Sequence, residues 1–293
     1  MLLRLALAIA DRLSRLLPSS VAYPLADFAG EVWHRVAPGR RQLVAANLAR
    51  VCEATGRPAR GAALRALVRA AFRNHARYYL ELLRAPHYDP ARADEIVDVP
   101  EWPDIQRPLS DGAAILVSAH LGNFEPFGIF LATHGLRPLA PIEVIEPPAL
   151  FEFLAARRGG GGPELVPLQH ARRPLIERLR AGGIIAIIGD RDLDGTGHPV
   201  MMFGHQTTMP IGPAWLAVNQ RAAILVGSCL RLGPDRFRTL GELMPLPDTG
   251  DRRADVRLLV ERIAARFERD IGAAPEQWWG AFQPFWPDLG RTP

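Results

Sequence analysis

Residues 113–125, AAILVSAHLGNFE, begin as an uninterrupted apolar run and end in a polar loop that carries a histidine and a glutamate. Two later runs have the same apolar character, IIAIIG at residues 184–189 and AAILVGSCL at residues 222–230. Short runs of Ile, Leu and Val between Gly, Pro and polar residues suit strands that are buried on both faces. They predict a parallel or mixed sheet.

Helix-like stretches separate these runs, and residues 1 to about 95 show apolar positions at helical spacing. Alternating strands and helices predict an α/β fold with a mixed, largely parallel central sheet flanked by helices. We expect a helical N-terminal section at residues 1–95 and an α/β core at residues 96–293, integrated into a single domain. The helix-like stretches of the core are FEPFGIFLATHG, PPALFEFLAARR, ARRPLIERLRAGG and PIGPAWLAVNQRA.

The chain contains no lysine, so every basic side chain is an arginine, and the net charge is +4. Arginine binds phosphate well through its planar fork, but an Ala-, Gly-, Pro- and Arg-rich composition is also what a GC-rich genome produces. Because the surplus is small and the arginines are scattered among acids, we expect no nucleic-acid partner. The two cysteines, Cys52 and Cys229, lie far apart, which argues against a disulfide framework or a zinc site and favours a reducing compartment.

Several common catalytic and nucleotide-binding motifs are missing from the sequence. A chain without lysine has no G-x-x-x-x-G-K-[ST] loop, and no G-x-G-x-x-G stands between the first strand and its helix. No G-x-S-x-G follows a strand either. The commonest nucleotide-binding and serine-hydrolase interpretations are therefore disfavoured.

The N-terminal stretch MLLRLALAIADRLSRLL reads as an amphipathic helix with a charged stripe and a wide leucine-rich face. Arg4, Asp11, Arg12 and Arg15 interrupt it, so it is no spanning helix, and no signal-peptide cleavage site is evident. Such a helix either lies in a membrane interface or packs on the domain as an ordinary surface helix. The residues leave both possibilities open.

His120 follows the first predicted strand, at the carboxyl edge where open α/β sheets place their active sites. A neutral imidazole can take a proton from a hydroxyl, and a carboxylate on its other nitrogen stabilises the imidazolium that forms. Glu125 can approach His120 only if the chain turns at Leu121–Asn123, because residues five apart on one helix point in different directions. The alternative is a structural histidine beside a glutamate that caps a helix.

A second polar group, GDRDLDG, follows the predicted strand at residues 184–189. It brings Asp190, Arg191, Asp192 and Asp194 to the same sheet edge as His120. The alternatives are a solvated charged loop or a loop that holds Mg²⁺, although the metal interpretation lacks a phosphate-binding loop to support it.

Two further features have both a functional and a structural interpretation. Arg157 and Arg158 precede a glycine tract and can either clamp an anionic group or remain solvated. The cluster around Met201 and Phe203 can either line a slot for a flexible apolar chain or fill the core.

The chain resembles the lysophospholipid acyltransferase superfamily in four segments and in their order. These segments are LVSAHLGNFEPFG, FLAARR…ELVPL, GDRDLDGTG…VMMFG…TTMPIGPAWLA and PEQWWGAFQPFW. Within this superfamily the chain is most similar to the branch of the lipid A biosynthesis lauroyl and myristoyl acyltransferases and the phosphatidylinositol mannoside acyltransferases. The resemblance extends over roughly residues 40 to 290. It implies a glycerolipid acyltransferase-like fold.

The resemblance also implies roles for individual residues. His120 and Glu125 match the family's histidine, four residues, Asp or Glu motif, with His120 as general base. Asp190 competes with Glu125 as the partner that orients His120, and Asp at this position departs from the Glu that phosphatidylinositol mannoside enzymes tend to have. Substrate or donor contacts are expected at Arg157, Arg191, Asp192, Asn123, Phe203 and Pro210.

Together with these residues, the resemblance implies an O-acyltransferase that moves a fatty acyl chain from acyl-CoA or acyl carrier protein to a hydroxyl of a membrane glycolipid. The acceptor is expected to resemble phosphatidylinositol mannoside or lipid A. Thioester-to-hydroxyl transfer needs a base, its orienter and an oxyanion-stabilising group, and it needs no metal, no cofactor and no covalent enzyme intermediate. We expect a monomer at the cytoplasmic face of the inner membrane, peripheral or monotopic, with the N-terminal helix as its membrane contact.

Two alternatives belong to other functional classes. One is a non-catalytic lipid-binding protein on the same fold. The other is an acyl-thioester hydrolase in which His120 activates water.

Overall fold

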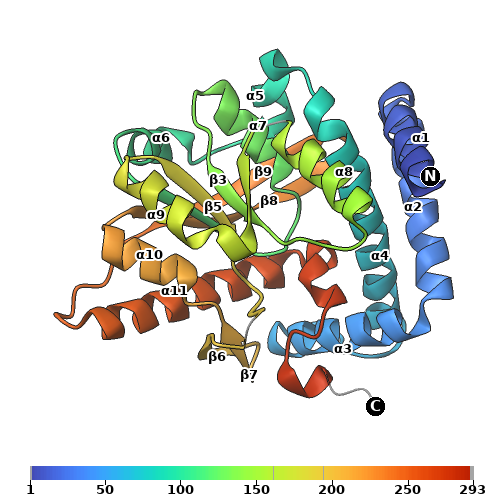
Figure 1. Ribbon diagram of the computed structural model, residues 1–293. Coiled ribbons are helices and arrows are strands. Elements are labelled where there is room, and N and C mark those ends of the chain that lie inside the picture. The colour runs from blue at the N-terminus through green and yellow to red at the C-terminus, as the bar shows by residue number, and fades with distance from the viewer. Residues whose placement is uncertain (1, 161, 194, 291–293) are drawn as a thin grey trace.

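The computed structural model describes residues 2–160, 162–193 and 195–290, which contain a seven-stranded sheet of order β1-β9-β8-β2-β5-β3-β4 (Figure 1). Neighbouring strands are parallel except for the antiparallel pair β8 and β9. The predicted α/β fold with a mixed, largely parallel sheet is therefore confirmed. Its strands are β1 (Val97–Asp98), β2 (Ala114–Ser118), β3 (Leu139–Ile142), β4 (Glu164–Pro167), β5 (Ile184–Ile188), β8 (Ala223–Gly233) and β9 (Arg236–Met244).

Helices cover the sheet and fill the N-terminal part of the chain. The N-terminal helices are α1 (Leu2–Leu16), α2 (Ser19–Val36), α3 (Pro38–Ala54) and α4 (Gly61–Arg84). The others are α5 (Ala93–Ile96), α6 (Trp102–Ser110), α7 (Glu125–Thr133), α8 (Pro148–Gly159), α9 (Arg172–Arg180), α10 (Gly212–Gln220) and α11 (Arg252–Ala273). Short 3₁₀ helices occur at Ala85–His87, Pro90–Arg92, Leu168–His170, Pro275–Gln277, Trp279–Phe282 and Pro287–Leu289. The hairpin of β6 (His198–Met202) and β7 (His205–Met209) forms a separate antiparallel pair against α11.

Strand β2 lies in the middle of the sheet and is apolar up to its last residue, Ser118, because helices cover both faces. Ile115 and Val117 point into the core shared with α9, α10 and α11, whereas Ala114 and Leu116 point into the core shared with α6 and α7. This alternation follows from the two-residue period of a strand. The protein is thus a layered structure of helices, sheet and helices.

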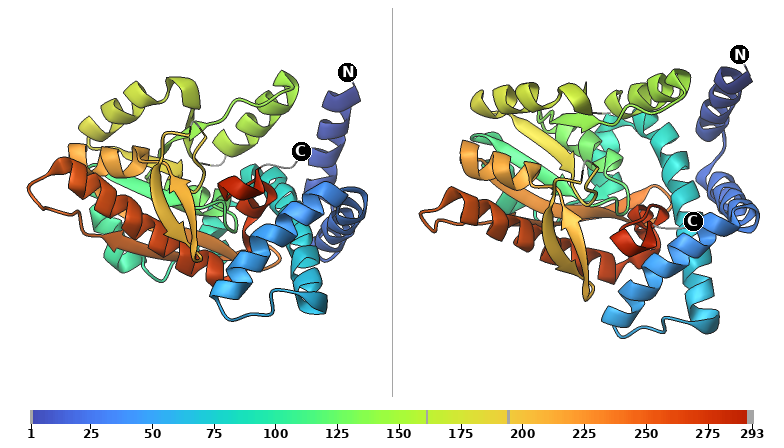
Figure 2. Two further views of the ribbon diagram at one scale, coloured as in Figure 1. Left: turned by 90° about the horizontal axis from the view of Figure 1, so that it is seen from below. Right: turned by 60° about the horizontal axis from the view of Figure 1, so that its bottom comes forward.

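Helices α1 and α2 lie along one edge of the molecule, outside α4 (Figures 1 and 2). No helix in the described ranges is both long enough and apolar enough to cross a membrane. Gly30 marks the place where α2 comes closest to α4, because a Cβ there would lie 2.7 Å from the backbone oxygen of Phe72. A glycine at this position lets the two helix backbones touch.

A buried carboxylate joins these helices to the sheet. Glu81 of α4 is fully buried and receives two hydrogen bonds from the Arg231 guanidinium on β8, one of them 2.7 Å long from Nη2. The Tyr23 hydroxyl of α2 donates to the same carboxylate over 2.9 Å. Helices α2 and α4 are thereby fixed against the central sheet.

We predict that Gly30→Ala lowers the free energy of unfolding by about 1 to 3 kcal/mol, because the added methyl group forces α2 away from α4. Gly39→Ala in α3 is the matched control, since a Cβ there meets nothing within 4 Å. Alanine favours a helix over glycine, so the control should be unchanged or more stable by up to about 1 kcal/mol. Urea unfolding measures the free energy of unfolding of both variants. Equal changes in the two variants would show that the close approach at Gly30 is unimportant.

Candidate active site

His120 and Asp190 meet because their strands are parallel neighbours in register. Ser118 at the end of β2 pairs with Ile188 at the end of β5, and each polar residue comes two positions later. The Gly189 amide donates to the Ser118 carbonyl over 2.8 Å, which extends the pairing by one residue. The Nδ1 atom of His120 then forms a hydrogen bond with Oδ1 of Asp190.

The Asp190 carboxylate is fully buried, and the Nε1 group of Trp278 donates to its second oxygen over 3.3 Å. Burial raises the pKa of the carboxyl, but the charge and hydrogen bonds of His120, with help from Trp278, outweigh burial and lower the pKa overall. Asp190 is therefore ionised at neutral pH. An ionised carboxylate on Nδ1 fixes the tautomer of His120 and leaves Nε2 to accept a proton.

The C-terminal segment completes this pair. The Trp279 amide donates to the His120 carbonyl over 2.9 Å, and the two rings meet edge to face with centroids 4.4 Å apart. A Cβ at Gly280 would lie 2.4 Å from Nε1 of Trp278 and 2.9 Å from Oδ2 of Asp190. The Trp-Trp-Gly sequence was part of the resemblance, yet nothing in the sequence alone assigned these three residues to the site.

The loop between His120 and α7 is held by backbone contacts with two distant segments. Gly122 has φ of +66° and donates to the Gln277 carbonyl over 3.0 Å, and the Asn123 amide donates to the Cys229 carbonyl over 2.7 Å. A Cβ at Gly122 would lie only 2.1 Å from the Cys229 carbonyl oxygen. Only glycine fits this position, for both its φ and its space.

Asn123 is fully buried and acts inside the protein. Its Nδ2 group donates to Glu81 over 2.9 Å, and its Oδ1 accepts from the Glu125 amide over 3.0 Å at the start of α7. The residue was expected to contact substrate or donor. The structure instead places it between α4, the loop and α7.

Glu125 lies beside Arg158, and the structure pairs it with this arginine instead of His120. Nε of Arg158 donates to Glu125 over 3.2 Å, and Nη2 of Arg158 donates to the Tyr78 hydroxyl over 2.9 Å. Burial raises the pKa of the Glu125 carboxyl despite the opposing charge of Arg158. Of the two carboxylates considered for orienting His120, Asp190 is the one in contact with it.

An apolar cavity of about 150 Å³ opens beside this loop. It touches the loop at Ser118, Phe124 and Glu125, on either side of His120 in the sequence, and Arg158 is its cationic lining residue. Strands β2, β3, β5, β8 and β9 and helices α6 and α7 supply most of the remaining wall. Apolar cavities of this size hold a molecule such as benzene, so a segment of an apolar chain fits.

The side chains of three other expected contact residues, Arg157, Arg191 and Asp192, have partners outside the His120–Asp190 pair. Arg157 turns outward to Asp11 of α1, with Nε donating over 2.7 Å, while its neighbour Arg158 lines the cavity. Arg191 lies 3.8 Å from Glu143, and Asp192 accepts from the amides of Gly195 and Gly197 within its own loop. Asp194 lies outside the described residues.

Of the candidate residues at and after the β6–β7 hairpin, only Phe203 belongs to the core. Phe203 is buried at the β6–β7 turn with φ of +52°, and its amide donates to Glu268 over 2.8 Å. Met201 at the same hairpin is exposed. Pro210 is half-buried between β7 and α10. The cavity lining includes none of these three residues.

Both cysteines are buried free thiols. Within the described part of the chain, His, Cys, Asp and Glu side chains do not gather in groups of three that could hold a metal ion.

His75 of α4 is a second buried histidine close to the site. Its ring lies against Phe282 at 4.3 Å and against Trp279 at 5.8 Å, and its Nδ1 has no hydrogen-bond partner among the described residues. Burial, assisted by the charges of Arg40 and His120, lowers the pKa of His75 to about 3. The imidazole is therefore neutral at any pH near 7.

Comparison with known proteins finds a family whose sequence model matches this chain. The model of the family described as bacterial lipid A biosynthesis acyltransferase matches residues 3–286. The phosphatidylinositol mannoside acyltransferase of Mycolicibacterium smegmatis is 31% identical over 225 residues, which cover 75% of this chain and 72% of the relative. Its counterpart in Mycobacterium tuberculosis is 31% identical over 235 residues, which cover 77% of this chain and 72% of the relative.

The close approach at Gly122 gives a stability prediction. Gly122→Ala should cost roughly 3 kcal/mol or more of unfolding free energy, because it adds a backbone clash to the penalty for a positive φ. Gly135→Ala is the matched control, since Gly135 has φ of +77° and open space around its Cβ position. The control should cost only about 1 to 2 kcal/mol. Equal losses in urea unfolding would contradict the packing of the loop against Cys229.

His75 gives a prediction on pH dependence. The folded protein keeps this histidine neutral down to about pH 3, whereas the unfolded chain protonates it near pH 6.5. Its contribution to stability is therefore complete above about pH 6.5 and declines as the pH falls, by up to about 1.4 kcal/mol per unit. When the pH falls from about 7.5 to about 5, the free energy of unfolding of His75→Phe should decrease by about 2 kcal/mol less than that of the wild type, as measured by urea unfolding.

His170→Phe is the control, because His170 is exposed. The change in its free energy of unfolding between the two pH values should equal that of the wild type. An unchanged pH dependence in His75→Phe would show that His75 is protonated in the folded protein.

Proposed function

The chain belongs to the bacterial lipid A biosynthesis acyltransferase family and is an acyltransferase, and we propose that His120 is its general base. The proposed reaction moves a fatty acyl chain from an acyl-CoA or acyl carrier protein thioester to a hydroxyl of a membrane glycolipid. The observation that carries the proposal is the hydrogen bond between Nδ1 of His120 and the buried carboxylate of Asp190. It leaves Nε2 as the basic atom.

The chemistry follows from this pair. Nε2 of His120 takes the proton of the acceptor hydroxyl as its oxygen attacks the thioester carbonyl, and Asp190 stabilises the imidazolium. The tetrahedral intermediate then breaks its carbon–sulfur bond, and the departing thiolate recovers the proton from Nε2. The product is an ester and a free thiol, and the enzyme returns to its starting state without a covalent intermediate.

The cavity supports the choice of an acyl donor. Its wall is apolar apart from a few groups such as the Glu125–Arg158 pair, which lies next to the loop of His120. A fatty acyl chain can lie along this wall, because burying its methylene groups contributes roughly 0.8 kcal/mol each. The thioester carbon would then remain near the loop, within reach of the reacting hydroxyl.

The acceptor is proposed to be a mannosylated phosphatidylinositol or a similar glycolipid. The relatives that share 31% identity with this chain are named phosphatidylinositol mannoside acyltransferases. This similarity covers about three quarters of the chain and favours that acceptor over lipid A.

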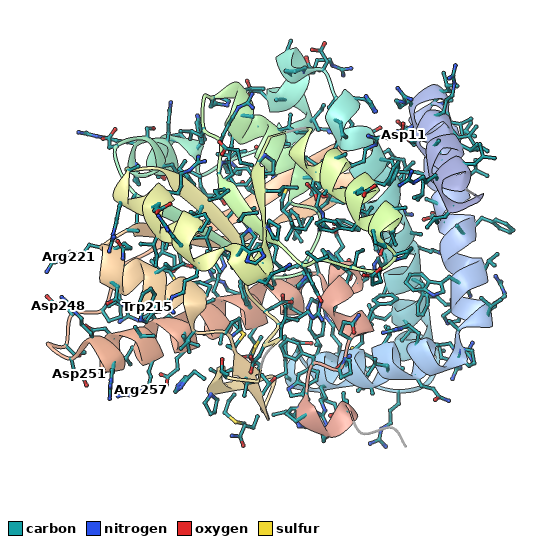
Figure 3. The ribbon with its side chains drawn as sticks, viewed as in Figure 1. Asp11, Trp215, Arg221, Asp248, Asp251 and Arg257 are labelled. Carbon is teal, nitrogen blue, oxygen red and sulfur yellow. The ribbon has the colours of Figure 1, made fainter. Side chains whose placement is uncertain are left out.

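Helix α1 supports a membrane location, because its apolar face points outward. Asp11 and Ser14 are buried against the protein, whereas Leu5, Ile9 and Leu16 are exposed. Figure 3 shows Asp11 on the side of α1 that faces the rest of the molecule. A helix that packs only on a domain would turn its leucines inward. We therefore propose a peripheral or monotopic protein at the cytoplasmic face of the inner membrane, where thioester donors and glycolipid acceptors meet.

The transfer mechanism is tested with two variants at the pair. His120→Ala should lower the rate of transfer by roughly 10²- to 10⁴-fold, and Asp190→Asn should lower it by a comparable factor because the tautomer is no longer fixed. The control is His170→Ala, at an exposed position in a short 3₁₀ helix. Thiol release and acylated lipid are measured together, with both acyl-CoA and acyl carrier protein as donors.

The same assay separates the alternatives. Folded His120→Ala protein with wild-type transfer would refute the role of His120. Thiol release that does not depend on added acceptor would indicate a hydrolase. Wild-type protein that binds lipid vesicles but turns over no donor would indicate a lipid-binding protein.

A further inference from the structure

The positive charge of the chain is concentrated in one region. Residues 19–84, which span α2 to α4, contain eleven arginines and four acidic residues, Asp27, Glu31, Glu53 and Glu81. This is a surplus of seven positive charges in a chain whose overall net charge is +4. The arginines are thus less evenly scattered among acids than the composition of the whole chain suggests, and α2, α3 and α4 form a positive region.

Four of these arginines form a ladder on α4, at positions 65, 69, 73 and 77. Residues four apart lie on one side of a helix. Glu31 of α2 accepts hydrogen bonds from both Arg69 and Arg73, and Nη1 of Arg35 lies 3.5 Å from the same carboxylate. Three guanidinium groups share one carboxylate, so most of their N–H groups remain for other acceptors.

Helix α2 carries an apolar stripe next to this ladder, formed by exposed side chains spaced three or four residues apart. Its members are Val21, Leu25, Phe28, Val32 and Val36. Glu31 precedes Val32 by one residue, so the Glu31–arginine cluster lies on the flank of the stripe. The surface therefore combines exposed aliphatic and aromatic side chains with guanidinium groups beside them.

The corner between α1 and α2 is held by Arg84, which is buried. Its guanidinium donates to the carbonyls of Ser14 and Leu17 over 2.8 and 2.5 Å and to the Ser19 hydroxyl over 2.8 Å. Helices α1 and α2 therefore lie along one edge with a fixed corner between them (Figure 2). The exposed leucines of α1 and the stripe of α2 are carried by these two helices.

We propose that α2 and α4 form a docking surface for anionic phospholipids, in which the stripe of α2 enters the acyl region and the arginines bind phosphate head groups. This deepens the membrane contact of the proposed function and rests on it. A bilayer fits both halves of the surface, because basic residues beside an apolar helix face are typical of interfacial helices. Nucleic acid would use the arginines but would leave the apolar stripe uncovered.

The proposal is tested by flotation of the full-length protein with vesicles, without donor or acceptor. Wild-type protein should bind phosphatidylcholine vesicles that contain phosphatidylglycerol more tightly than vesicles of phosphatidylcholine alone, and added salt should weaken this preference. The charge variant is Arg35→Gln with Arg65→Gln, which leaves Arg69 and Arg73 on Glu31. It should lose roughly fivefold in partitioning to anionic vesicles for each arginine removed, and nothing on neutral vesicles.

Two further variants complete the design. Phe28→Ser removes an exposed aromatic ring and should weaken binding to both kinds of vesicle. The control, Arg173→Gln with Arg180→Gln, removes two exposed arginines from α9, which lies on the other side of the molecule from α2 (Figure 1). It should bind both kinds of vesicle like the wild type.

Wild-type binding by the charge variant, or an equal loss in the α9 control, would overturn the proposal. So would a wild type that prefers duplex DNA and does not distinguish the two kinds of vesicle. Transfer to a detergent-solubilised acceptor separates this proposal from the catalytic one, since the charge variant should keep the wild-type rate there. Loss of that rate would show that the arginines serve the reaction and not the membrane.

Discussion

The hydrogen bonds of the buried Glu81 carboxylate are the interactions on which the rest of the structure depends. The carboxylate receives hydrogen bonds from Tyr23 of α2, Asn123 of the loop after His120 and Arg231 of β8. Removing one partner from a buried ion pair costs more than the pair itself contributes, because an uncompensated charge remains. These contacts make the position of the loop inseparable from the position of the helices at the edge. The loop after His120 and the helices α2 and α4 are thus parts of one packed unit.

The sheet and its polar edge were predictable because they follow from short-range patterns. Uninterrupted apolar runs predict buried strands, and parallel strands bring the residues after them to one edge, as observed for His120 and Asp190. Only the structure could show which of the two carboxylates, Glu125 or Asp190, contacts His120. Glu125 follows a turn whose direction is set by Cys229 and Gln277, and these residues are more than a hundred positions away.

Other details depend on rotations that sequence patterns do not fix. Neighbouring helix positions differ by about 100°, which is why Arg158 lines the cavity while Arg157 pairs with Asp11. The periodicity of α1 showed that one face is apolar but not which face is buried. The burial of Asp11 and its pairing with Arg157 of α8 show which face is buried. The neighbours of Phe203 in sequence left a ligand slot and core packing both open, and the hairpin turn places the residue in the core.

The dependence of Asp190 on Trp278 and Gly280 has a consequence for biosynthesis. Chains fold from the N-terminus while they are being made, so α1 and α2 leave the ribosome long before the C-terminal tryptophans. A growing chain can present its outward leucines to a lipid surface while the carboxylate beside His120 still lacks its indole partner. With the membrane contact and the general base proposed above, attachment would precede activity, and a chain released before its C-terminal tryptophans would carry the membrane contact without a completed His120–Asp190 pair.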